Sequence, residues 1–147
     1  MKAITIHHPW ASLIACGEKR IETRSWPTKY RGEIAIHAGI KPIPRDYYGI
    51  RDLLPCVCDF PYGKVIAIAE LVDCLQVSAT FNDTGPFSAM LENLRSINGK
   101  EFMFGDYTPG RYAWILANVR RIEPVPAKGM QRLWEWDEKG LRYAYAN

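Results

Sequence analysis

One long apolar run constrains the fold of this chain more than any other feature. Residues 63–74 read Gly-Lys-Val-Ile-Ala-Ile-Ala-Glu-Leu-Val-Asp-Cys and contain an uninterrupted apolar stretch from Val65 to Ala69. Val and Ile in such a run favour a strand. Apolar side chains at successive positions indicate that both faces of the strand are covered. We therefore expect residues 63–74 to form the central strand of a sheet or one wall of a barrel.

Shorter segments on both sides of this run predict the other elements. The further expected strands are residues 2–7, 21–26, 33–38, a short segment around 102–104, and 111–122. Helices are expected at residues 10–16, 46–54 and 87–97, and a loop with a short turn or helix at 128–136. The first of these helices follows Pro9, which suits a first helical turn, and precedes Gly17, which suits a left-handed C-terminus.

The order of these elements indicates a fold class. Five or six strands with few helices, and no regular alternation of strand and helix, argue against a doubly wound sheet. A mainly β, or α+β, architecture fits better, namely a small mixed β-barrel of about six strands, partly closed, with peripheral helices. A length of 147 residues is typical of one domain, so we expect residues 1–147 to form a single domain.

Composition excludes several functional classes. No apolar run approaches the ~20 residues of a membrane-spanning helix, and the first residues are too few and too polar for a secretory signal. We therefore expect a cytoplasmic protein without membrane contact. The spacing of Cys56 and Cys58 matches neither a zinc site nor a redox pair, and no second Cys or His pair lies nearby. No metal and no cofactor is expected.

Charge is unevenly distributed along the chain. Residues 1–32 hold six basic and two acidic side chains, residues 33–110 hold six and ten, and residues 111–147 hold seven and four. If the two basic ends come together in the fold, they form a positive surface that attracts phosphates. A net charge of +3 is also what scattered solubilising side chains would give, so charge alone does not select a nucleic-acid ligand.

The segment 17–26, Gly-Glu-Lys-Arg-Ile-Glu-Thr-Arg-Ser-Trp, holds the densest set of candidate functional residues. Side chains alternate along a strand, so Glu22, Arg24 and Trp26 share one face, and Lys19 lies at the turn that leads into the strand. Two cations, a carboxylate and an aromatic ring at one place suit an anionic ligand that carries a base.

These residues, in their context, resemble the ASCH (activating-signal-cointegrator homology) domain. The resemblance rests on the run from His8 to Ile14, on Gly17-x-Lys19-x-x-Glu22-x-Arg24-x-Trp26, and on segments 30–38, 63–74, 112–116 and 126–134, so it covers most of the chain. It implies a PUA-like pseudobarrel of about six strands, a fold associated with RNA binding and modification. It also implies a nucleic-acid-binding cleft lined by Lys19, Glu22 and Arg24.

The resemblance extends more distantly to a branch that hydrolyses the amide of acetylated cytidine with a Lys, a Thr and a Glu. By position, that Lys corresponds to Lys19 and that Glu to Glu70, whereas Glu22 stands in place of the Thr. The adjacent Thr23 would face the other side of a strand. The missing nucleophile argues against this amidohydrolase activity. Some bacterial ASCH-like proteins are linked to RNA cleavage, which requires no matching Thr.

Each residue of the motif has more than one interpretation. Burial and the neighbouring Arg24 would lower the pKa of Lys19, which suits a base or nucleophile, and phosphate contact is the alternative. Glu22 and Arg24 form either a structural salt bridge or a ligand contact, in which Arg24 binds phosphate or a base edge and Glu22 accepts from an exocyclic amine. Glu70 lies in an apolar strand, where a carboxylate needs a partner. We expect that partner to be Lys19 or Arg24, with Glu70 as counter-ion or general base.

We therefore expect a nucleic-acid-binding domain whose ligand is RNA or a nucleoside. The expected ligand-binding residues are His8, Lys19, Glu22, Arg24, Trp26, Arg31, Tyr112, Lys128 and Arg132, with Trp26 and Tyr112 stacking on bases and Arg31, Lys128 and Arg132 contacting phosphates. The alternative is a small hydrolase acting on RNA or on a modified nucleoside, with Lys19 and Glu70 as the proton-transfer pair and water as the nucleophile. A protein-interaction domain is a third alternative.

Overall fold

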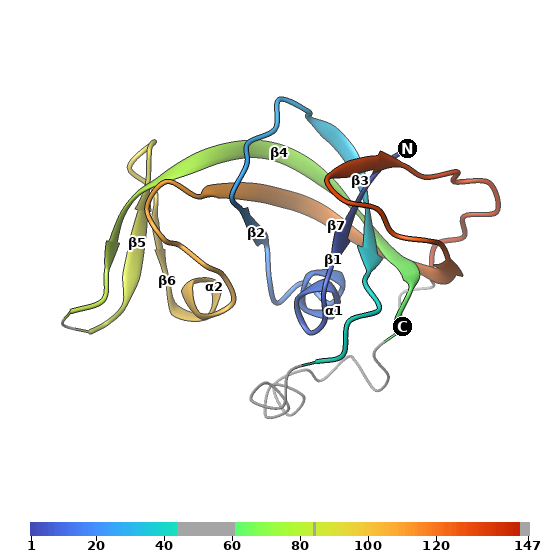
Figure 1. Ribbon diagram of the computed structural model, residues 1–147, viewed down its shortest axis with the longest axis horizontal. Helices are drawn as coiled ribbons and strands as arrows, with labels where there is room; N and C mark the ends of the chain where they lie inside the picture. Colours follow the sequence, from blue (N-terminus) through green and yellow to red (C-terminus); the bar gives the residue numbers. More distant parts are fainter. Residues whose placement is uncertain (44–60, 84, 145–147) are drawn as a thin grey trace. The chain divides into compact units, whose positions relative to one another are not determined.

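A computed structural model describes residues 1–43, 61–83 and 85–144 of the chain (Figure 1). Its elements in chain order are β1 (Lys2–Ile6), α1 (Trp10–Ala15), β2 (Ile21–Arg24), β3 (Gly32–Ala38), β4 (Lys64–Phe81), β5 (Ser88–Leu91), β6 (Ser96–Asn98), α2 (Gly99–Met103), β7 (Tyr112–Pro126) and β8 (Leu133–Glu135). The helix expected at 46–54 lies outside the described residues. Neither α1 nor α2, the helices of the described ranges, is long and apolar enough to cross a membrane.

The strands form an eight-stranded mixed sheet in the order β2-β7-β4-β3-β1-β8, and β5 pairs with both β4 and β6. β1 and β3 are parallel, with Ala3 opposite Ala35, whereas β1 and β8 are antiparallel, with Ala3 opposite Trp134. The expected mainly β architecture of mixed strands with peripheral helices is confirmed. The sheet has two more strands than the expected six, and no pairing within the described residues closes it.

Internal contacts divide the chain into two compact units. The first unit comprises Met1–Glu18, Glu33–Glu70 and Asn118–Asn147, and the second comprises Lys19–Gly32 and Leu71–Ala117. β4 and β7, the two long curved strands of Figure 1, each contribute one part to each unit. The expectation of a single domain stays a prediction.

The first unit has an apolar core and a buried hydrogen-bonded chain beside it. The core contains Ala3, Ala35, Val65, Ile68, Ile122, Trp134 and Trp136. His37 Nε2 donates to the carbonyl oxygen of Ala127 (2.8 Å), so its Nδ1 accepts from the Thr5 hydroxyl (3.2 Å). Thr5 Oγ1 in turn accepts from Trp134 Nε1 (3.1 Å). The chain of bonds ties the segment after β7 to β1, β3 and β8.

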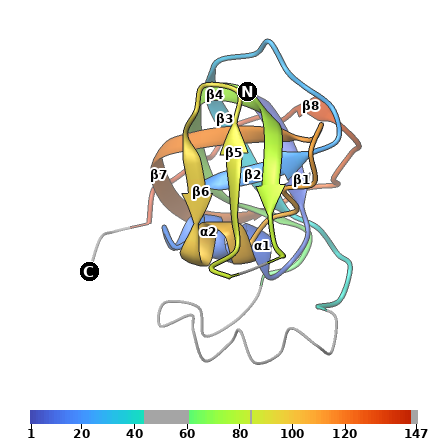
Figure 2. The ribbon, with the colours of Figure 1, turned by 90° about the vertical axis from the view of Figure 1, so that its left-hand side faces the viewer.

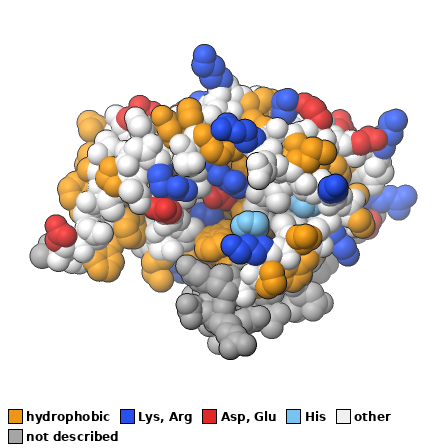
Figure 3. Space-filling view, in the orientation of Figure 1, with side chains coloured by type: hydrophobic (Ala, Val, Ile, Leu, Met, Phe, Trp, Pro, Cys, Tyr) orange, Lys and Arg blue, Asp and Glu red, His pale blue; other side chains and the backbone are white. Residues whose placement is uncertain are grey.

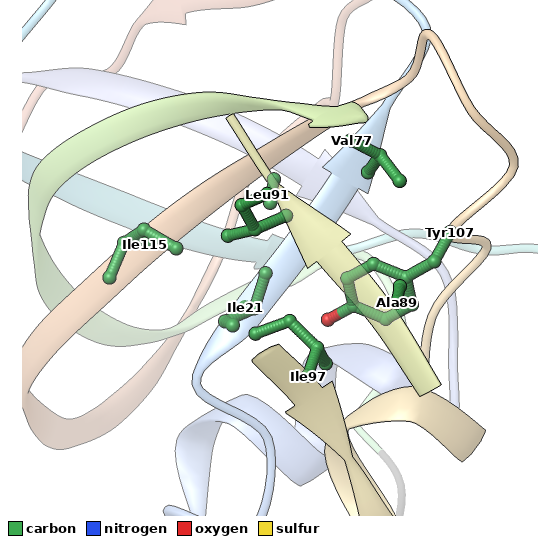
Figure 4. Close-up of a cluster of buried hydrophobic side chains, with 8 residues drawn as sticks. Ile21, Val77, Ala89, Leu91, Ile97, Tyr107 and Ile115 are labelled. Carbon is green, nitrogen blue, oxygen red and sulfur yellow. The ribbon is translucent and has the colours of Figure 1, made fainter. Parts of the chain in front are cut away.

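The second unit is built around a cluster that Figure 4 shows in close-up. Its buried members are Ile21, Val77, Ala89, Leu91, Ile97, Tyr107, Ala113 and Ile115. β5 and β6 lie side by side with the end of β4 in Figure 2, and their pairing sets Ala89 opposite both Thr80 and Ile97. The cluster therefore fixes β2 against the β4–β5–β6 part of the second unit through Ile21.

Several local predictions are confirmed. α1 ends before Gly17, whose φ of 84° provides the left-handed C-terminus. In β2, Ile21 and Thr23 are buried whereas Glu22 and Arg24 are half-buried, which is the expected alternation. Of the predicted residues 63–74, all from Lys64 onward form a strand, and all positions from Val65 to Ala69 are buried. β4 continues to Phe81, further than the apolar run indicated.

Three predictions of secondary structure are wrong. Residues 87–97 form the hairpin of β5 and β6, because Ala89 and Leu91 are buried with a period of two and Leu94 occupies the turn. Residues 102–104 are not a strand: α2 ends at Met103, and its last turn is closed by the Phe104 N–H, which donates to the Lys100 carbonyl. Within 128–136, the structure has the strand β8 where a turn or helix was expected, because β8 pairs with β1.

Candidate functional site

The second unit brings together the Lys, Glu and Arg of the Gly-x-Lys-x-x-Glu-x-Arg pattern. Lys19 lies two positions before the first residue of β2, in the segment that leads into the strand, as expected, and Glu22 and Arg24 project from the half-buried face of that strand. The β2–β7 register places Glu22 opposite Trp114 and Arg24 opposite Tyr112. Side chains of directly opposite residues lie on the same face of a sheet. Arg24 and Tyr112 are therefore neighbours on the face that carries Glu22.

Lys19 is the most unusual residue of this group because its side chain is only 1% exposed. Its ammonium Nζ donates to the carbonyl oxygen of Phe104, at the end of α2, over 2.8 Å. Burial lowers the pKa of Lys19; Glu22 and Glu101 act in the opposite direction, and Arg24 lowers the pKa further. The expected lowering by burial and by Arg24 is confirmed. Lys19 therefore loses its proton more readily than a surface lysine does.

Aromatic side chains adjoin the motif. The rings of Trp26 and Trp114 make an edge-to-face contact with centroids 4.7 Å apart, and Trp114 Nε1 donates to the Trp26 carbonyl over 3.3 Å. Trp114 is 1% exposed, whereas Trp26 and Tyr112 are half-buried. The fixed Trp114 thus holds Trp26 in place and leaves part of Trp26 and of Tyr112 accessible to a ligand.

Two further residues of the second unit belong to this site, and the sequence analysis missed both. Glu101, in α2, accepts a hydrogen bond from the Arg20 N–H through Oε1, and burial raises the pKa of its carboxyl. Tyr107 is 2% exposed, and burial together with the charges of Glu101 and Glu22 raises its pKa. No spacing in the sequence relates either residue to Lys19, which lies more than 80 positions earlier in the chain.

Arg31 is the remaining predicted residue of the second unit. Its guanidinium is exposed, forms an ion pair with Asp73 (3.3 Å) and donates to the carbonyl oxygens of Thr28 and Tyr30. These bonds hold Arg31 at the surface in one orientation. An exposed pair of this kind is weak enough to be exchanged for a phosphate contact.

Four predicted residues belong to the first unit. Glu70 Oε2 accepts from Asn118 Nδ2 over 2.8 Å, a partner that the sequence analysis did not name. His8 is fully buried: its Nε2 donates to the Pro61 carbonyl (2.7 Å) and its Nδ1 accepts from the Ser12 hydroxyl (3.0 Å). Contact of His8 with a ligand would therefore break a bond within the protein. The other two, Lys128 and Arg132, are exposed.

The surface shown in Figure 3 carries Lys and Arg side chains mixed with hydrophobic and acidic ones. In this view hydrophobic and acidic side chains lie between many of the Lys and Arg side chains.

The fold and the site together define a class of protein. It is a small β-rich domain that carries a partly buried motif of Lys, Glu and Arg beside aromatic rings. The family model described as the ASCH domain matches residues 4–126. The chain belongs to the ASCH domain family.

Two curated relatives are similar to most of the chain. Activating signal cointegrator 1 of Mus musculus and activating signal cointegrator 1 of Homo sapiens are each 27% identical to this chain, and the match covers 92% of the chain. The match spans only 22% of the length of each relative. The similarity thus concerns one part of these longer proteins.

Proposed function

We propose that this ASCH domain binds RNA through the motif of the second unit. The observation that carries the proposal is the juxtaposition of Arg24 with Tyr112 on the half-buried face of β2 and β7, next to Glu22. A guanidinium binds phosphate or a base edge, and a half-exposed aromatic ring stacks on an unpaired base. Single-stranded or looped RNA offers both groups together.

The candidate residues divide by role under this proposal. Trp26 and Tyr112 provide stacking surfaces, Arg24 and Arg31 contact phosphates, and Glu22 accepts from a base. Lys128 and Arg132 of the first unit are proposed as further phosphate contacts because both are exposed. His8 is proposed as a structural residue, because both of its ring nitrogens are hydrogen-bonded within the first unit.

Fluorescence anisotropy with a labelled single-stranded RNA tests the proposal. The affinity of the wild-type chain for RNA should fall steeply between about 50 and 200 mM salt, since Lys and Arg side chains that contact phosphates release counterions from the RNA. Arg24→Ala should weaken binding by about tenfold or more, corresponding to the loss of one charge-assisted contact. Lys139→Ala removes the same charge from an exposed position of the first unit and serves as the control. Equal affinities of the wild type and Arg24→Ala would refute the proposal.

A second candidate function is favoured by one observation, the buried Lys19 with its lowered pKa. A neutral lysine amine is a general base. In this alternative, Lys19 accepts a proton from the water that attacks the acetyl carbonyl of N4-acetylcytidine and returns it to the leaving amine as the amide C–N bond breaks, so that cytidine and acetate are released. Incubation with acetylated cytidine, and separately with RNA, followed by chromatography tests for turnover. Product formation that Lys19→Met abolishes would support the hydrolase, and the absence of any product would leave RNA binding as the function.

A further inference from the structure

One peptide bond, between Asn98 and Gly99, joins β6 to α2 in the second unit. Asn98 is the last residue of β6 and pairs with Ser88, and Gly99 is the first residue of α2 (Figure 2). Both residues of this bond are exposed, whereas Ile97, one position earlier, is 3% exposed and belongs to the core cluster of the unit. The junction therefore follows directly on a fixed strand and is itself open to solvent.

The side chain of Asn98 has no part in holding the fold. Asn98 occupies the N-cap position of α2, where an asparagine side chain commonly accepts from a helical N–H, but within the described residues it makes no capping hydrogen bond. Two other asparagines are held: Asn93 Oδ1 accepts from the Arg95 N–H (3.0 Å), and Asn118 Nδ2 donates to Glu70 (2.8 Å). The Asn98 amide is thus free to turn toward the backbone that follows it.

The residue that follows offers an unhindered backbone nitrogen. Gly99 has a φ of 58°, a conformation that a residue with a Cβ atom adopts only at a cost. Among the described residues, no atom beyond the adjoining chain would lie within 4 Å of a Cβ built there. The N–H at the first position of a helix also has no partner within the helix. Neither a side chain nor an intrahelical bond therefore shields this nitrogen from the neighbouring amide.

We propose that Asn98 is a site of spontaneous deamidation, independent of any RNA binding. The Gly99 backbone nitrogen loses its proton to hydroxide and attacks Asn98 Cγ, so that an N–Cγ bond forms. The Cγ–Nδ2 bond then breaks, and the amide nitrogen takes a proton from water and leaves as ammonia. Water adds to one of the two carbonyls of the resulting succinimide ring, and the ring opens to aspartate or isoaspartate. The net change is the exchange of ammonia for water.

The isoaspartate product would act on the parts that α2 holds in place. In isoaspartate the main chain runs through the side-chain methylene, so the link between Ile97 and α2 becomes longer by one carbon. α2 carries Glu101, which accepts from the Arg20 N–H, and it is followed by Phe104, whose carbonyl accepts from Lys19 Nζ over 2.8 Å. A longer link displaces α2 from these partners. Lys19, now 1% exposed, should then become accessible to solvent.

Mass spectrometry of the intact chain after incubation at mildly alkaline pH tests the site. Trypsin releases residues 96–100 as one peptide, in which Asn98 is the only side-chain amide. We expect Asn98 to convert about tenfold or more faster than Asn93 and Asn118, which corresponds to a barrier lower by about 1.4 kcal/mol. Fragmentation of the peptide distinguishes aspartate from isoaspartate. Conversion of Asn98 no faster than that of the two held asparagines would overturn the proposal.

A matched pair of variants tests the part played by the glycine. Gly99→Ala should slow the conversion of Asn98 by about tenfold, because the Cβ atom hinders the attacking nitrogen. Gly110→Ala makes the same change at another exposed glycine of the second unit with positive φ (93°) and open space around it, and it should keep the wild-type rate. An undiminished rate in Gly99→Ala would overturn the mechanism. Thermal unfolding verifies that both variants fold.

Acylation of lysines by acetic anhydride, measured on the same incubated samples, tests the effect on α2. Labelling of Lys19 should rise in proportion to the isoaspartate content, whereas the exposed Lys139 should be labelled equally throughout. Asn98→Asp supplies the new charge without the longer backbone and should keep Lys19 protected. Unchanged labelling of Lys19 in the converted chain would overturn the link between this junction and α2.

Discussion

Substitution of Gly129 by alanine tests how the segment after β7 is held in the first unit. A Cβ atom at position 129 would lie 2.7 Å from both Thr5 Oγ1 and His37 Cε1, and 2.9 Å from His37 Nδ1. Distances below 3.0 Å between such atoms are essentially never found, so His37 and Thr5 must move. The backbone at Gly129 is not in the left-handed region, and the expected cost of the substitution is therefore steric.

The magnitude follows from what His37 would lose. The imidazole is bonded to Thr5 over 3.2 Å and to the Ala127 carbonyl over 2.8 Å. A buried hydrogen bond contributes about 0.5–1.5 kcal/mol, so displacement of the ring costs about 1–3 kcal/mol. Overpacking of a filled interior costs about the same when the bonds survive and the neighbours are strained instead. We expect Gly129→Ala to lower the free energy of unfolding by about 2 kcal/mol.

Urea denaturation followed by tryptophan fluorescence measures this change. Lys128→Ala alters the adjacent, exposed position and should change the free energy of unfolding by less than about 0.5 kcal/mol. A loss of less than about 0.5 kcal/mol for Gly129→Ala itself would show that the segment after β7 does not lie against His37 and that the hydrogen-bonded chain through Thr5, His37 and Ala127 is wrong.

Three further predictions concern stability. Burial lowers the pKa of both His8 and His37 in the folded chain, so the free energy of unfolding should be highest above the ordinary histidine pKa of 6.5. It should fall as the pH drops below 6.5, by at most about 1.4 kcal/mol per pH unit for each ring. Urea titrations at several pH values measure the slope, and a rise in stability on acidification would contradict the prediction. Lys19→Arg places a larger, permanently charged group at a site that is 1% exposed, so the free energy of unfolding should fall by about 3 kcal/mol in the same assay. A loss below about 1 kcal/mol would mean that the Phe104 carbonyl does not confine the side chain. Leu94→Gly should raise the melting temperature, since Leu94 has a φ of 68° and is 77% exposed, whereas an unchanged or lower value would indicate that the side chain stabilises the hairpin.

The elements that were predicted correctly are those whose structure is determined by residues close together in the sequence. The apolar run from Val65 to Ala69 identified β4, and alternation identified the two faces of β2. The β5–β6 hairpin was missed because Met90, Leu91 and Leu94 also fit a helical period. Pairing with other strands decides between these alternatives, and a single sequence does not show that pairing.

The residues of the candidate site also divide into those that a local sequence pattern predicted and those that only the fold brings together. The motif identified Lys19, Glu22 and Arg24, and the lowered pKa of Lys19 followed from expected burial beside Arg24. Glu101 and Tyr107 come from a segment far along the chain, and neither has a residue pattern that connects it with the motif. Only the folded arrangement, in which Phe104 accepts a bond from Lys19 across 85 positions of sequence, brings that segment to the site.

The chain passes back and forth between its two units, so that the first is assembled from three separate stretches of sequence and the second from two. No terminal deletion and no single cut can therefore release either one as a contiguous fragment. Because both termini belong to the first unit, a truncation series would remove residues of that unit first and would leave the second unit interrupted by Glu33–Glu70. Mapping in this protein has to proceed by point substitution in the intact chain.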